Sequence, residues 1–311
     1  MPAELNVEKE TMRQLTAPLS AEALHGALMQ LHHTRLVPDG PGHDWQAELV
    51  RGAEWSLREG VFLEEERRAV ADWAREAPGT GAAFASWFDA LRERGPGQHD
   101  PLFDYLAEQA SHEEMRWFLR QEVAGEAGFE DLVALTQLRL PARPKLELAR
   151  NYWDEMGRGK VVGMHGPMLA DLARAVGVVC TDLREIVWEA LAVGNVLAGL
   201  AYNRRFAFHS IGALGAVELT APTRAVKVVQ GLDRLDVEHE ASRYFRLHAT
   251  IDVIHARDWR DEVLVPLIDE RPEVARWIAE GALMRLRAGA RSYERYRREL
   301  GLTRGSIVGR G

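Results

Sequence analysis

Residues 248–255 read HATIDVIH, which places His248, Asp252 and His255 at intervals of four and three residues. Because an α-helix turns by about 100° per residue, the three side chains fall on one stripe of a helix. The residues around them are mainly apolar: Phe245, Leu247, Ile251 and Ile254. This composition predicts a largely buried helix, in which three ionisable groups are costly unless they are paired or bind a metal. Two imidazoles and a carboxylate suit iron, manganese or zinc.

The same stripe has two other interpretations. It can be a solvent-facing polar face, or two core histidines can be satisfied by Asp252. Because a short motif of this kind often occurs by chance, the metal interpretation needs further ligands elsewhere in the chain.

A second stretch, residues 151–168, reads NYWDEMGRGKVVGMHGPM and holds Glu155 and His165 ten residues apart. On one unbroken helix these side chains would point to different sides. Gly157 and Gly159 interrupt the helical pattern, so the chain can turn and bring His165 back towards Glu155. The alternative is an ordinary helix end at Gly157 with Glu155 in solvent.

Two more carboxylates lie in apolar surroundings. Glu218 lies in HSIGALGAVELTAP, with no other charge between His209 and Arg224, and Glu122 lies in WFLRQEVAGEAGF. An unpaired buried carboxylate is expensive, so a cation partner is expected. An acidic helix face explains Glu122 equally well, because Glu126 follows it closely.

Helical periodicity dominates the rest of the chain, and alternating β-branched runs are almost absent. Ser20 is a plausible N-cap for the segment that follows it. Breaks rich in Gly and Pro, and the loop PARP after Leu140, separate the other segments. Helices are predicted over residues 44–59, 61–76, 80–93, 101–124, 145–156, 165–177, 183–200, 203–219, 223–235, 238–256 and 271–300.

The composition excludes several classes of protein. The chain has 311 residues and a formal charge of −8, which gives it no general reason to bind nucleic acid or anionic lipid. The N-terminus has no apolar core of a secretory signal, and the most apolar stretch, residues 186–202, is interrupted by Glu189 and Asn195. The single cysteine, Cys180, allows no intramolecular disulfide and lies in an apolar run where a thiol is usually inert. A cytoplasmic protein without membrane spans is expected.

Together, the candidate ligands come from four separate helical segments, as do the inward-facing Glu and His residues of metal-binding helix bundles. Their order along the chain is Glu, Glu-x9-His, Glu, His-x3-Asp-x2-His. In this order and over residues 105–265 the chain resembles the haem-oxygenase-like di-iron oxidases and oxygenases, also described as iron-containing redox enzymes. The residues that carry the resemblance are Glu122, Glu155, His165, Glu218, His248, Asp252 and His255. Glu126, Glu113 or Glu114 are alternatives for Glu122.

The resemblance implies an all-α, seven-helix bundle that binds two iron ions, with O2 as co-substrate and room for an external electron donor. It implies N-oxygenation of a small amine or amino-acid-like substrate in specialised metabolism. Oxidative desaturation or carbon–carbon cleavage with the same metal site is the alternative. A metal-free enzyme or a non-catalytic protein of the same fold are further alternatives.

The predicted organisation has three parts. Residues 1–100 form a helical extension packed on the core, residues 101–300 form the di-iron bundle, and residues 301–311 form a flexible tail. No catalytic residue beyond the metal ligands is predicted, and a homodimer is the default for an enzyme. Residues expected near the substrate are Trp153, Tyr202, Arg204, Arg205 and His209, of which the two arginines could pair with a carboxylate. Surface arginines and core aromatic residues are the ordinary alternative.

Overall fold

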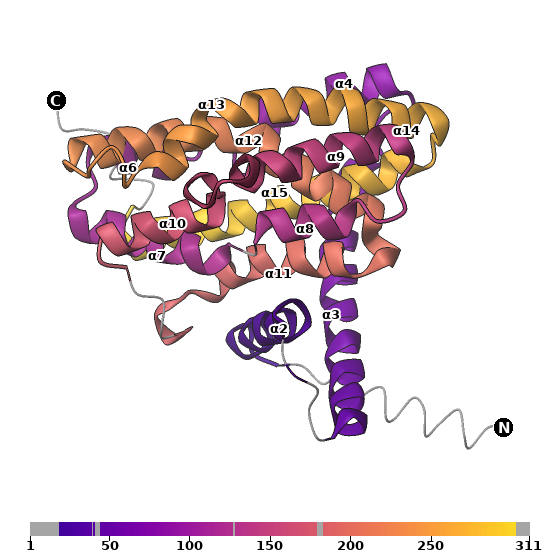
Figure 1. The fold of residues 1–311 in the computed structure, drawn as a ribbon, viewed down its shortest axis with the longest axis horizontal. Helices are drawn as coiled ribbons and strands as arrows, with labels where there is room; N and C mark the ends of the chain where they lie inside the picture. Colours follow the sequence, from indigo (N-terminus) through magenta and orange to yellow (C-terminus); the bar gives the residue numbers. More distant parts are fainter. Residues whose placement is uncertain (1–18, 39, 41–43, 127, 179–182, 303–311) are drawn as a thin grey trace.

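The computed structural model describes residues 19–38, 40, 44–126, 128–178 and 183–302. Cys180 and nearly all of the predicted tail 301–311 lie outside these ranges. Within them the fold is all-α, with one isolated β-bridge and no strand (Figure 1). The helices are α2 Ala21–Leu36, α3 Trp45–Ala74, α4 Gly81–Asp89, α5 Leu91–Arg94, α6 Pro101–Glu108, α7 His112–Gly125, α8 Phe129–Thr136, α9 Ala142–Glu155, α10 His165–Ala175, α11 Trp188–Tyr202, α12 Ala207–Arg234, α13 Arg243–Asp258, α14 Val265–Glu270 and α15 Val274–Glu299.

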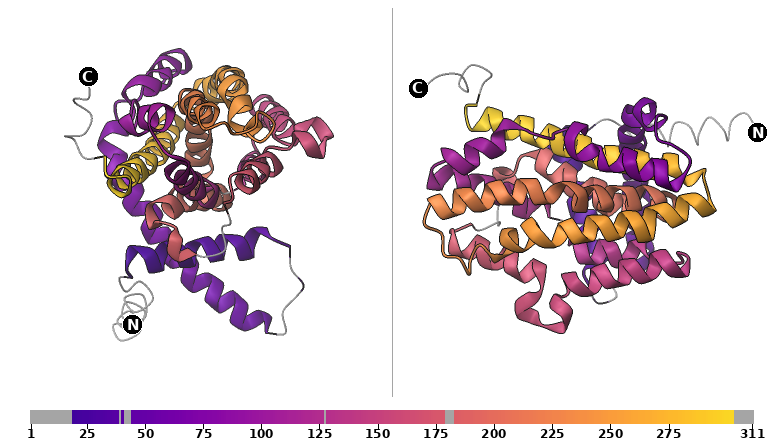
Figure 2. Two further views of the ribbon diagram at one scale, coloured as in Figure 1. Left: turned by 90° about the vertical axis from the view of Figure 1, so that its left-hand side faces the viewer. Right: turned by 90° about the horizontal axis from the view of Figure 1, so that it is seen from above.

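Helix α12 runs through the middle of the bundle and packs against α15, α13 and α6 (Figure 2). It crosses α15 at a point where both helices carry glycine. A Cβ at Gly212 would lie 1.9 Å from the carbonyl oxygen of Ile278, and a Cβ at Gly281 would lie 1.9 Å from that of His209. The two backbones therefore approach more closely than any side chain permits, which brings the residues of α12 deep into the core.

Two pairs of predicted helices are single helices in the structure. The segments 44–59 and 61–76 form α3, because Gly60 sits in open space and nothing there forces a turn. The segments 203–219 and 223–235 form α12, which continues through Pro222. Proline removes the N–H that would bond the carbonyl of residue 218, but buried residues on both sides hold the helix together. The interruption falls at Glu218, one of the predicted ligands.

Other helix ends also differ from the prediction. The segment 101–124 is broken into α6 and α7 because Ser111 and Glu114 form a capping box that starts a new helix. The loop predicted at residues 141–144 is a helix start, since Pro141 is the N-cap of α9. Ser20 caps α2 as predicted, with its hydroxyl accepting a hydrogen bond from the backbone N–H of Ala23.

Helix α13 continues through a π-helical turn, η5 (Trp259–Leu264), into α14. The prediction that α13 is largely buried is wrong. Val253 and Ile254 are exposed by half, because α13 lies on the outside of the bundle and buries only the stripe that faces α12 and α10. Asp252 and His255 lie on this stripe and are buried. No described helix is long and apolar enough to cross a membrane.

Helices α2 and α3 pack on α11, and α3 also contacts α15, while the first half of α3 projects from the bundle (Figures 1 and 2). A buried polar network joins them. His32 contacts Asn195 of α11 through Nδ1 (3.1 Å) and Glu59 of α3 through Nε2 (2.6 Å), and Arg35 donates to the same carboxylate. The side chain of Asn195 in turn donates to the carbonyl of His25. The division at residue 100 stays a prediction.

Candidate metal centre

Glu155 is the last residue of α9 and His165 is the first of α10. Two 3-10 turns, η1 (Gly157–Gly159) and η2 (Val161–Gly163), connect them, and the backbone on either side pairs in an antiparallel bridge. Nδ1 of His165 lies 2.5 Å from Oε2 of Glu155. The interrupted helix therefore brings the two side chains together, as the glycine pattern predicts.

The turn depends on Gly157. Its φ is +60°, and a Cβ there would lie 2.3 Å from the carbonyl carbon of Gly163. A residue with a side chain would be strained by its backbone angle and would collide with the opposite strand of the turn. The distance between Glu155 and His165 is thus set by a position that only glycine occupies without strain.

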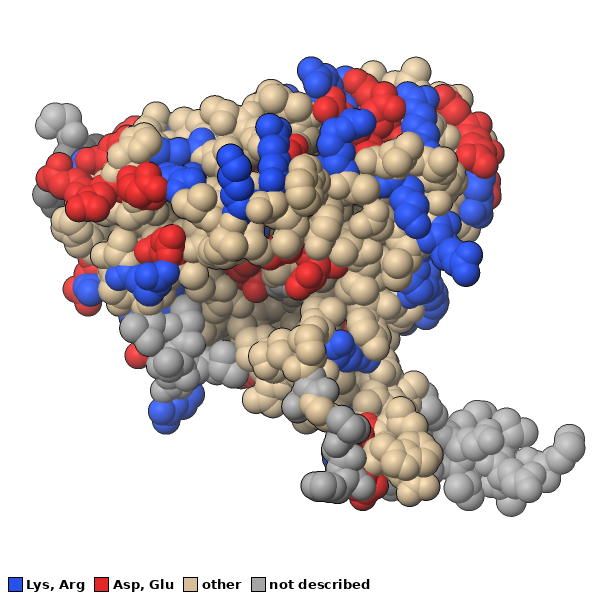
Figure 3. Space-filling view, in the orientation of Figure 1, with Lys and Arg blue, Asp and Glu red and all other residues tan. Residues whose placement is uncertain are grey.

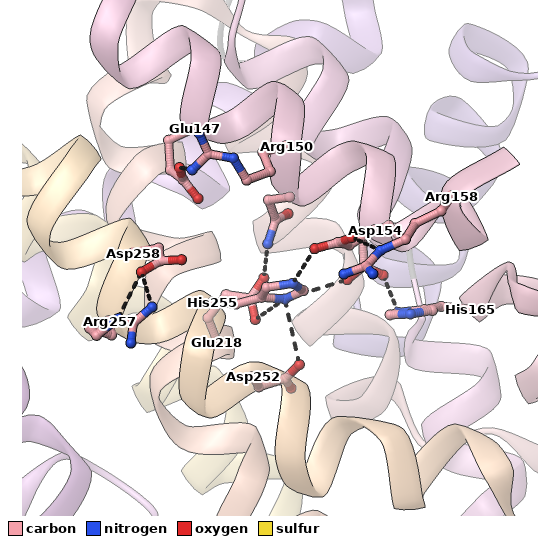
Figure 4. A network of polar contacts seen from close by, with 12 residues as sticks. Glu147, Arg150, Asp154, Arg158, His165, Glu218, Asp252, His255, Arg257 and Asp258 are labelled. Atoms are coloured by element: carbon pink, nitrogen blue, oxygen red, sulfur yellow. Dashed lines mark hydrogen bonds and ion pairs between the residues drawn. The ribbon is translucent and has the colours of Figure 1, made fainter.

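Helix α13 supplies the second part of the cluster. Nδ1 of His255 lies 3.4 Å from Oε2 of Glu218, 3.8 Å from Oδ1 of Asp252 and 4.0 Å from Oε1 of Glu155 (Figure 4). The ring of His248 packs edge-on against that of His165, with centroids 4.6 Å apart. Side chains from α9, α10, α12 and α13 therefore meet at one place in the interior.

Two groups of possible ligands share one residue. Glu155, His165 and His248 form one group, and Glu155, Glu218 and His255 form the other. Within each group the possible ligand atoms lie within 4.8 Å of one another. Because Glu155 has one oxygen near His165 and the other near His255, it can bridge two neighbouring ions.

Neighbouring groups fix the orientation of the ligands. Nδ1 of His248 donates to the carbonyl of Tyr244 at 2.7 Å, which leaves Nε2 for a metal. Nε2 of His255 lies 3.4 Å from Oδ2 of Asp154, which leaves Nδ1 facing the carboxylates. Asn151 donates to Oε1 of Glu218 at 2.6 Å. Asp154 and Asn151 were not foreseen from the sequence, because acceptors of this kind carry no motif.

The carboxylates repel one another. Burial, followed by the charge of Glu218, raises the pKa of Glu155 well above its usual value. Burial and the charges of Glu218 and Glu155 do the same to the pKa of Asp252. Buried carboxyl groups such as Glu155 and Asp252, whose pKa is raised by burial and by neighbouring carboxylates, are stabilised in the ionised form by a cation.

The histidines differ from one another. Burial lowers the pKa of His165 and that of His248 to about 4, so both rings are neutral at pH 7 and have a free lone pair. Burial also lowers the pKa of His255, but the hydrogen bond and charge of Glu218 and the charge of Glu155 outweigh it and raise the value to about 9.

Four buried polar atoms of this cluster form no hydrogen bond of regular geometry among the described residues, although carboxylates lie close to both nitrogens: Oε1 of Glu155, Nδ1 of His165, Oδ1 of Asp252 and Nδ1 of His255. Buried polar atoms without a partner are rare in proteins, and here several converge on one place. A set of imidazole nitrogens and carboxylate oxygens suits iron or manganese. The residues present therefore fit a metal centre.

A cavity of about 170 Å³ adjoins the cluster. Figure 3 shows acidic side chains gathered at a hollow in this face of the molecule, below α9 in the orientation of Figure 1. Glu155, His165, Glu218, His248 and Asp252 line the cavity, together with phenylalanine and aliphatic side chains. Small molecules typically bind in such a setting of apolar walls and a few convergent polar groups.

Glu122 also lines this cavity but belongs to neither ligand group. Burial raises its pKa, while the charges of Arg224 and Arg285 lower it, so its nearest charged neighbours are cationic. Glu130, at the start of α8, lies closer to the cluster. Its Oε1 would be 3.3 Å from a Cβ at Gly166, the residue next to His165, and its charge acts on the pKa of Glu155. Acidic residues are common in the first turn of any helix, so no sequence pattern singles out Glu130 as a possible ligand.

None of the five residues expected near the substrate lines this cavity, and each contacts protein elsewhere. Arg204 donates to the backbone carbonyls of residues 135, 136 and 138, and Arg205 pairs with Glu64. Nε2 of His209 lies 3.0 Å from Glu280. Arg204 and Arg205 lie in the 3-10 turn η4 (Arg204–Phe206) and His209 lies on α12, and in the structure these three side chains contact α8, α3 and α15 rather than the cavity.

The two aromatic residues of that set lie at the surface. The ring of Tyr202 lies 4.4 Å from the guanidinium carbon of Arg35. Trp153 is exposed by half and covers Gly159. Neither position faces the cavity, so the substrate pocket has to be described from other residues.

Comparison with known proteins agrees with this arrangement. The family model described as "Iron-containing redox enzyme" matches residues 116–290, which include all seven predicted ligands. This chain belongs to the iron-containing redox enzyme family. No curated protein matches it.

Two solved structures have a similar fold. One is a domain of unknown function with a heme oxygenase-like fold from Shewanella denitrificans OS217, with a TM-score of 0.50 and 15% identity, covering 70% of this chain and 90% of the other. The second is a CADD-like protein of unknown function from Nostoc punctiforme PCC 73102, with a TM-score of 0.53 and 20% identity, covering 69% and 95%. They confirm the expected all-α, haem-oxygenase-like fold.

Proposed function

We propose that this chain is a non-haem di-iron oxygenase that activates O2 and oxidises a small amine or amino-acid-like substrate, with N-oxygenation as the favoured reaction. The observation that carries the proposal is the position of Glu155 in both ligand groups. A carboxylate shared by two sets of ligands is what a pair of adjacent ions requires, whereas a single-ion site needs only one set.

In this proposal His165 and His248 would hold one ion, Glu218, Asp252 and His255 would hold the other, and Glu155 would be shared between them. Two ferrous ions bound here would supply the electrons with which O2 is activated. The protein contributes position and surroundings. Tyr244 and Asp154 hold the rings of His248 and His255, and Asn151 holds Glu218, so that the ligand atoms keep their directions when the substrate enters.

The cavity supports a small organic substrate. Phe118, Phe129 and Phe245 form apolar walls that exclude water, and Glu126 and Glu130 add acidic groups beside the cluster. Carboxylates in a dry pocket favour a substrate with an amino group, because they pair with its protonated form and accept its proton when the nitrogen reacts. Desaturation or carbon–carbon cleavage would use the same ligands.

Anaerobic titration with Fe(II) tests the metal site. We expect the protein to bind two ions per chain and to consume O2 faster after loading. We expect Glu155→Ala to lose both the two bound ions and the faster O2 consumption. Glu48→Ala is a matched control, because Glu48 is an exposed carboxylate in the first turn of α3. A chain that binds no iron, or one that binds a single ion with unchanged affinity in Glu155→Ala, would refute the proposal.

A further inference from the structure

Two arginines line the cavity that adjoins the metal ligands. Arg224 lies on α12 and Arg285 on α15, and both contribute to the wall together with Glu218 and Asp252. Arg204 and Arg205, which the sequence suggests as possible partners of a substrate carboxylate, do not line this cavity. The cavity thus has an acidic and imidazole end at the metal ligands and a cationic wall.

Neither arginine has a conventional partner. Within the described part of the chain, Arg224 forms no hydrogen bond or ion pair, and its one ring contact is with Tyr293, 5.8 Å from its guanidinium carbon. Nε of Arg285 is buried without a hydrogen-bond partner. Guanidinium groups usually pair when they are removed from bulk water, so this pair is available to a ligand.

The two charges also act on each other. Burial lowers the pKa of Arg224, and the charge of Arg285 lowers it further, while Glu122 and Asp252 have the opposite effect. Glu122 is the carboxylate on the same side of the cavity, but no ion pair within 4.0 Å joins it to either arginine. A second anion placed between the guanidinium groups would relieve their repulsion.

The geometry of α12 gives the distance along the helix between the metal ligand Glu218 and Arg224. The cavity is lined by Glu218, Ala221, Arg224, Ala225 and Val228, which form one stripe along this helix. Six residues separate Glu218 from Arg224, a rise of about 9 Å at about 1.5 Å per residue. This span suits a small molecule with an apolar body between two polar ends.

We propose that Arg224 and Arg285 form an anion-binding subsite that holds the carboxylate of the substrate while its reacting end lies at the metal ligands. The planar carboxylate matches the fork of a guanidinium, with two parallel N–H···O hydrogen bonds. The inference rests on the proposed function only in naming the metal end as the reacting end. Because Glu122 and Glu126 line the same cavity, the subsite accommodates an amino acid as well as a simple acid.

Isothermal titration calorimetry with hexanoate, hexanol and the hexylammonium ion as probes tests the subsite. The protein is used in the iron-loaded anaerobic form and in the iron-free form. Hexanoate is expected to bind at least about tenfold more tightly than hexanol, since a charged hydrogen-bond pair contributes at least that factor. Equal affinity for hexanoate and hexanol, or no binding of hexanoate, would overturn the subsite.

Variants assign the effect to the arginines. Arg224→Gln and Arg285→Gln are each expected to weaken hexanoate binding by about 10- to 100-fold. Arg224→Lys keeps the positive charge and is expected to lose less affinity for hexanoate than Arg224→Gln. Arg174→Gln is the matched control, because Arg174 is an exposed arginine paired with Asp171 on α10, outside the cavity. Thermal unfolding of each variant shows whether it is folded, and the comparison of probes on the wild type needs no variant.

The outcomes separate this inference from the proposed function. Hexanoate binding that depends on iron but not on either arginine would mean that the acid binds the metal directly, and would overturn the subsite. Binding that depends on the arginines in a protein that takes up no iron would support the subsite and refute the di-iron proposal. Iron uptake together with hexanoate binding that does not depend on the arginines would support the di-iron proposal and overturn the subsite.

Discussion

The side-chain amide of Asn151 donates a hydrogen bond of 2.6 Å to Oε1 of Glu218, and both residues are buried. The bond joins α9 to α12 and leaves Oε2 of Glu218 facing His255 at 3.4 Å. A carboxylate held in this way presents one oxygen in a fixed direction, so Asn151 determines the position of a ligand without binding a metal itself.

Replacement of Asn151 by leucine is expected to weaken the binding of the ion at Glu218 and His255 by about 10- to 100-fold, as loss of such supporting residues usually does. The ion held by His165 and His248 is expected to bind with nearly its original affinity. A two-step anaerobic Fe(II) titration measures both. Equal weakening of both steps would mean that Asn151 acts on the fold as a whole.

Substitution of the shared carboxylate has a different result. Glu155→Gln is expected to lose both ions or to lower both affinities by more than tenfold, because a carboxamide has one weak acceptor oxygen and no charge. Asp252→Asn, at a residue proposed to hold only the ion beside Glu218 and His255, is expected to affect that ion alone. Iron content after dialysis against a weak chelator compares the two. A Glu155→Gln protein that keeps one tightly bound ion would show that the carboxylate does not bridge.

The turn between α9 and α10 can be tested without touching a ligand. Gly157→Ala introduces a Cβ at φ +60° and 2.3 Å from the carbonyl carbon of Gly163. We expect a loss of about 1–3 kcal/mol in the free energy of unfolding, and weaker iron binding because His165 moves away from Glu155.

Gly60→Ala is the matched control for this substitution, since Gly60 lies inside α3 with nothing within 4 Å of its Cβ position. Alanine there is expected to stabilise the protein by about 0.5–1 kcal/mol. Urea denaturation measures both variants. If Gly157→Ala unfolds at the same urea concentration as the wild type, the turn is not strained as described.

The N-terminal helix has its own pH dependence. The ring of His25 stacks on Trp188 of α11, and burial, followed by the charge of Arg291, lowers its pKa from 6.5 to about 4. Between about pH 6.5 and pH 4 the imidazole of His25 is therefore protonated in the unfolded chain but neutral in the folded protein. The stability is full above pH 6.5 and falls by up to roughly 3 kcal/mol as the pH decreases to 4.

His25→Phe keeps a ring against Trp188 but cannot be protonated. Urea unfolding at pH 7 and pH 5 is expected to show a smaller loss of stability for this variant than for the wild type. Buried histidines of the metal cluster add the same loss to both proteins, so the difference between them reports His25 alone. Identical losses would contradict the assignment.

The sequence predicted those parts of the centre that depend on local spacing. His248, Asp252 and His255 share a stripe because helical geometry fixes their directions, and the glycines after Glu155 predicted its approach to His165. The role of Glu122 could not be settled in this way. Whether Glu122, Glu126 or Glu130 points at the cluster depends on how α7 and α8 pack on their neighbours. The local sequence pattern does not distinguish the three glutamates.

Features that depend on long-range packing were not foreseen. Arg224 and Arg285 lie on different helices, and each is an ordinary arginine in the sequence. The cavity brings them together because α12 and α15 cross closely at Gly212 and Gly281. The continuation of α12 through Pro222 was missed for the same reason, since burial on both sides outweighs the local cost of proline.

The central claim is that two iron ions share Glu155. Crystals of the protein loaded anaerobically with Fe(II), measured at the iron absorption edge, test it most directly. Two anomalous peaks are expected, one beside His165 and His248 and the other beside Glu218 and His255, with Glu155 between them. A single peak, or iron bound away from Glu155, would contradict it.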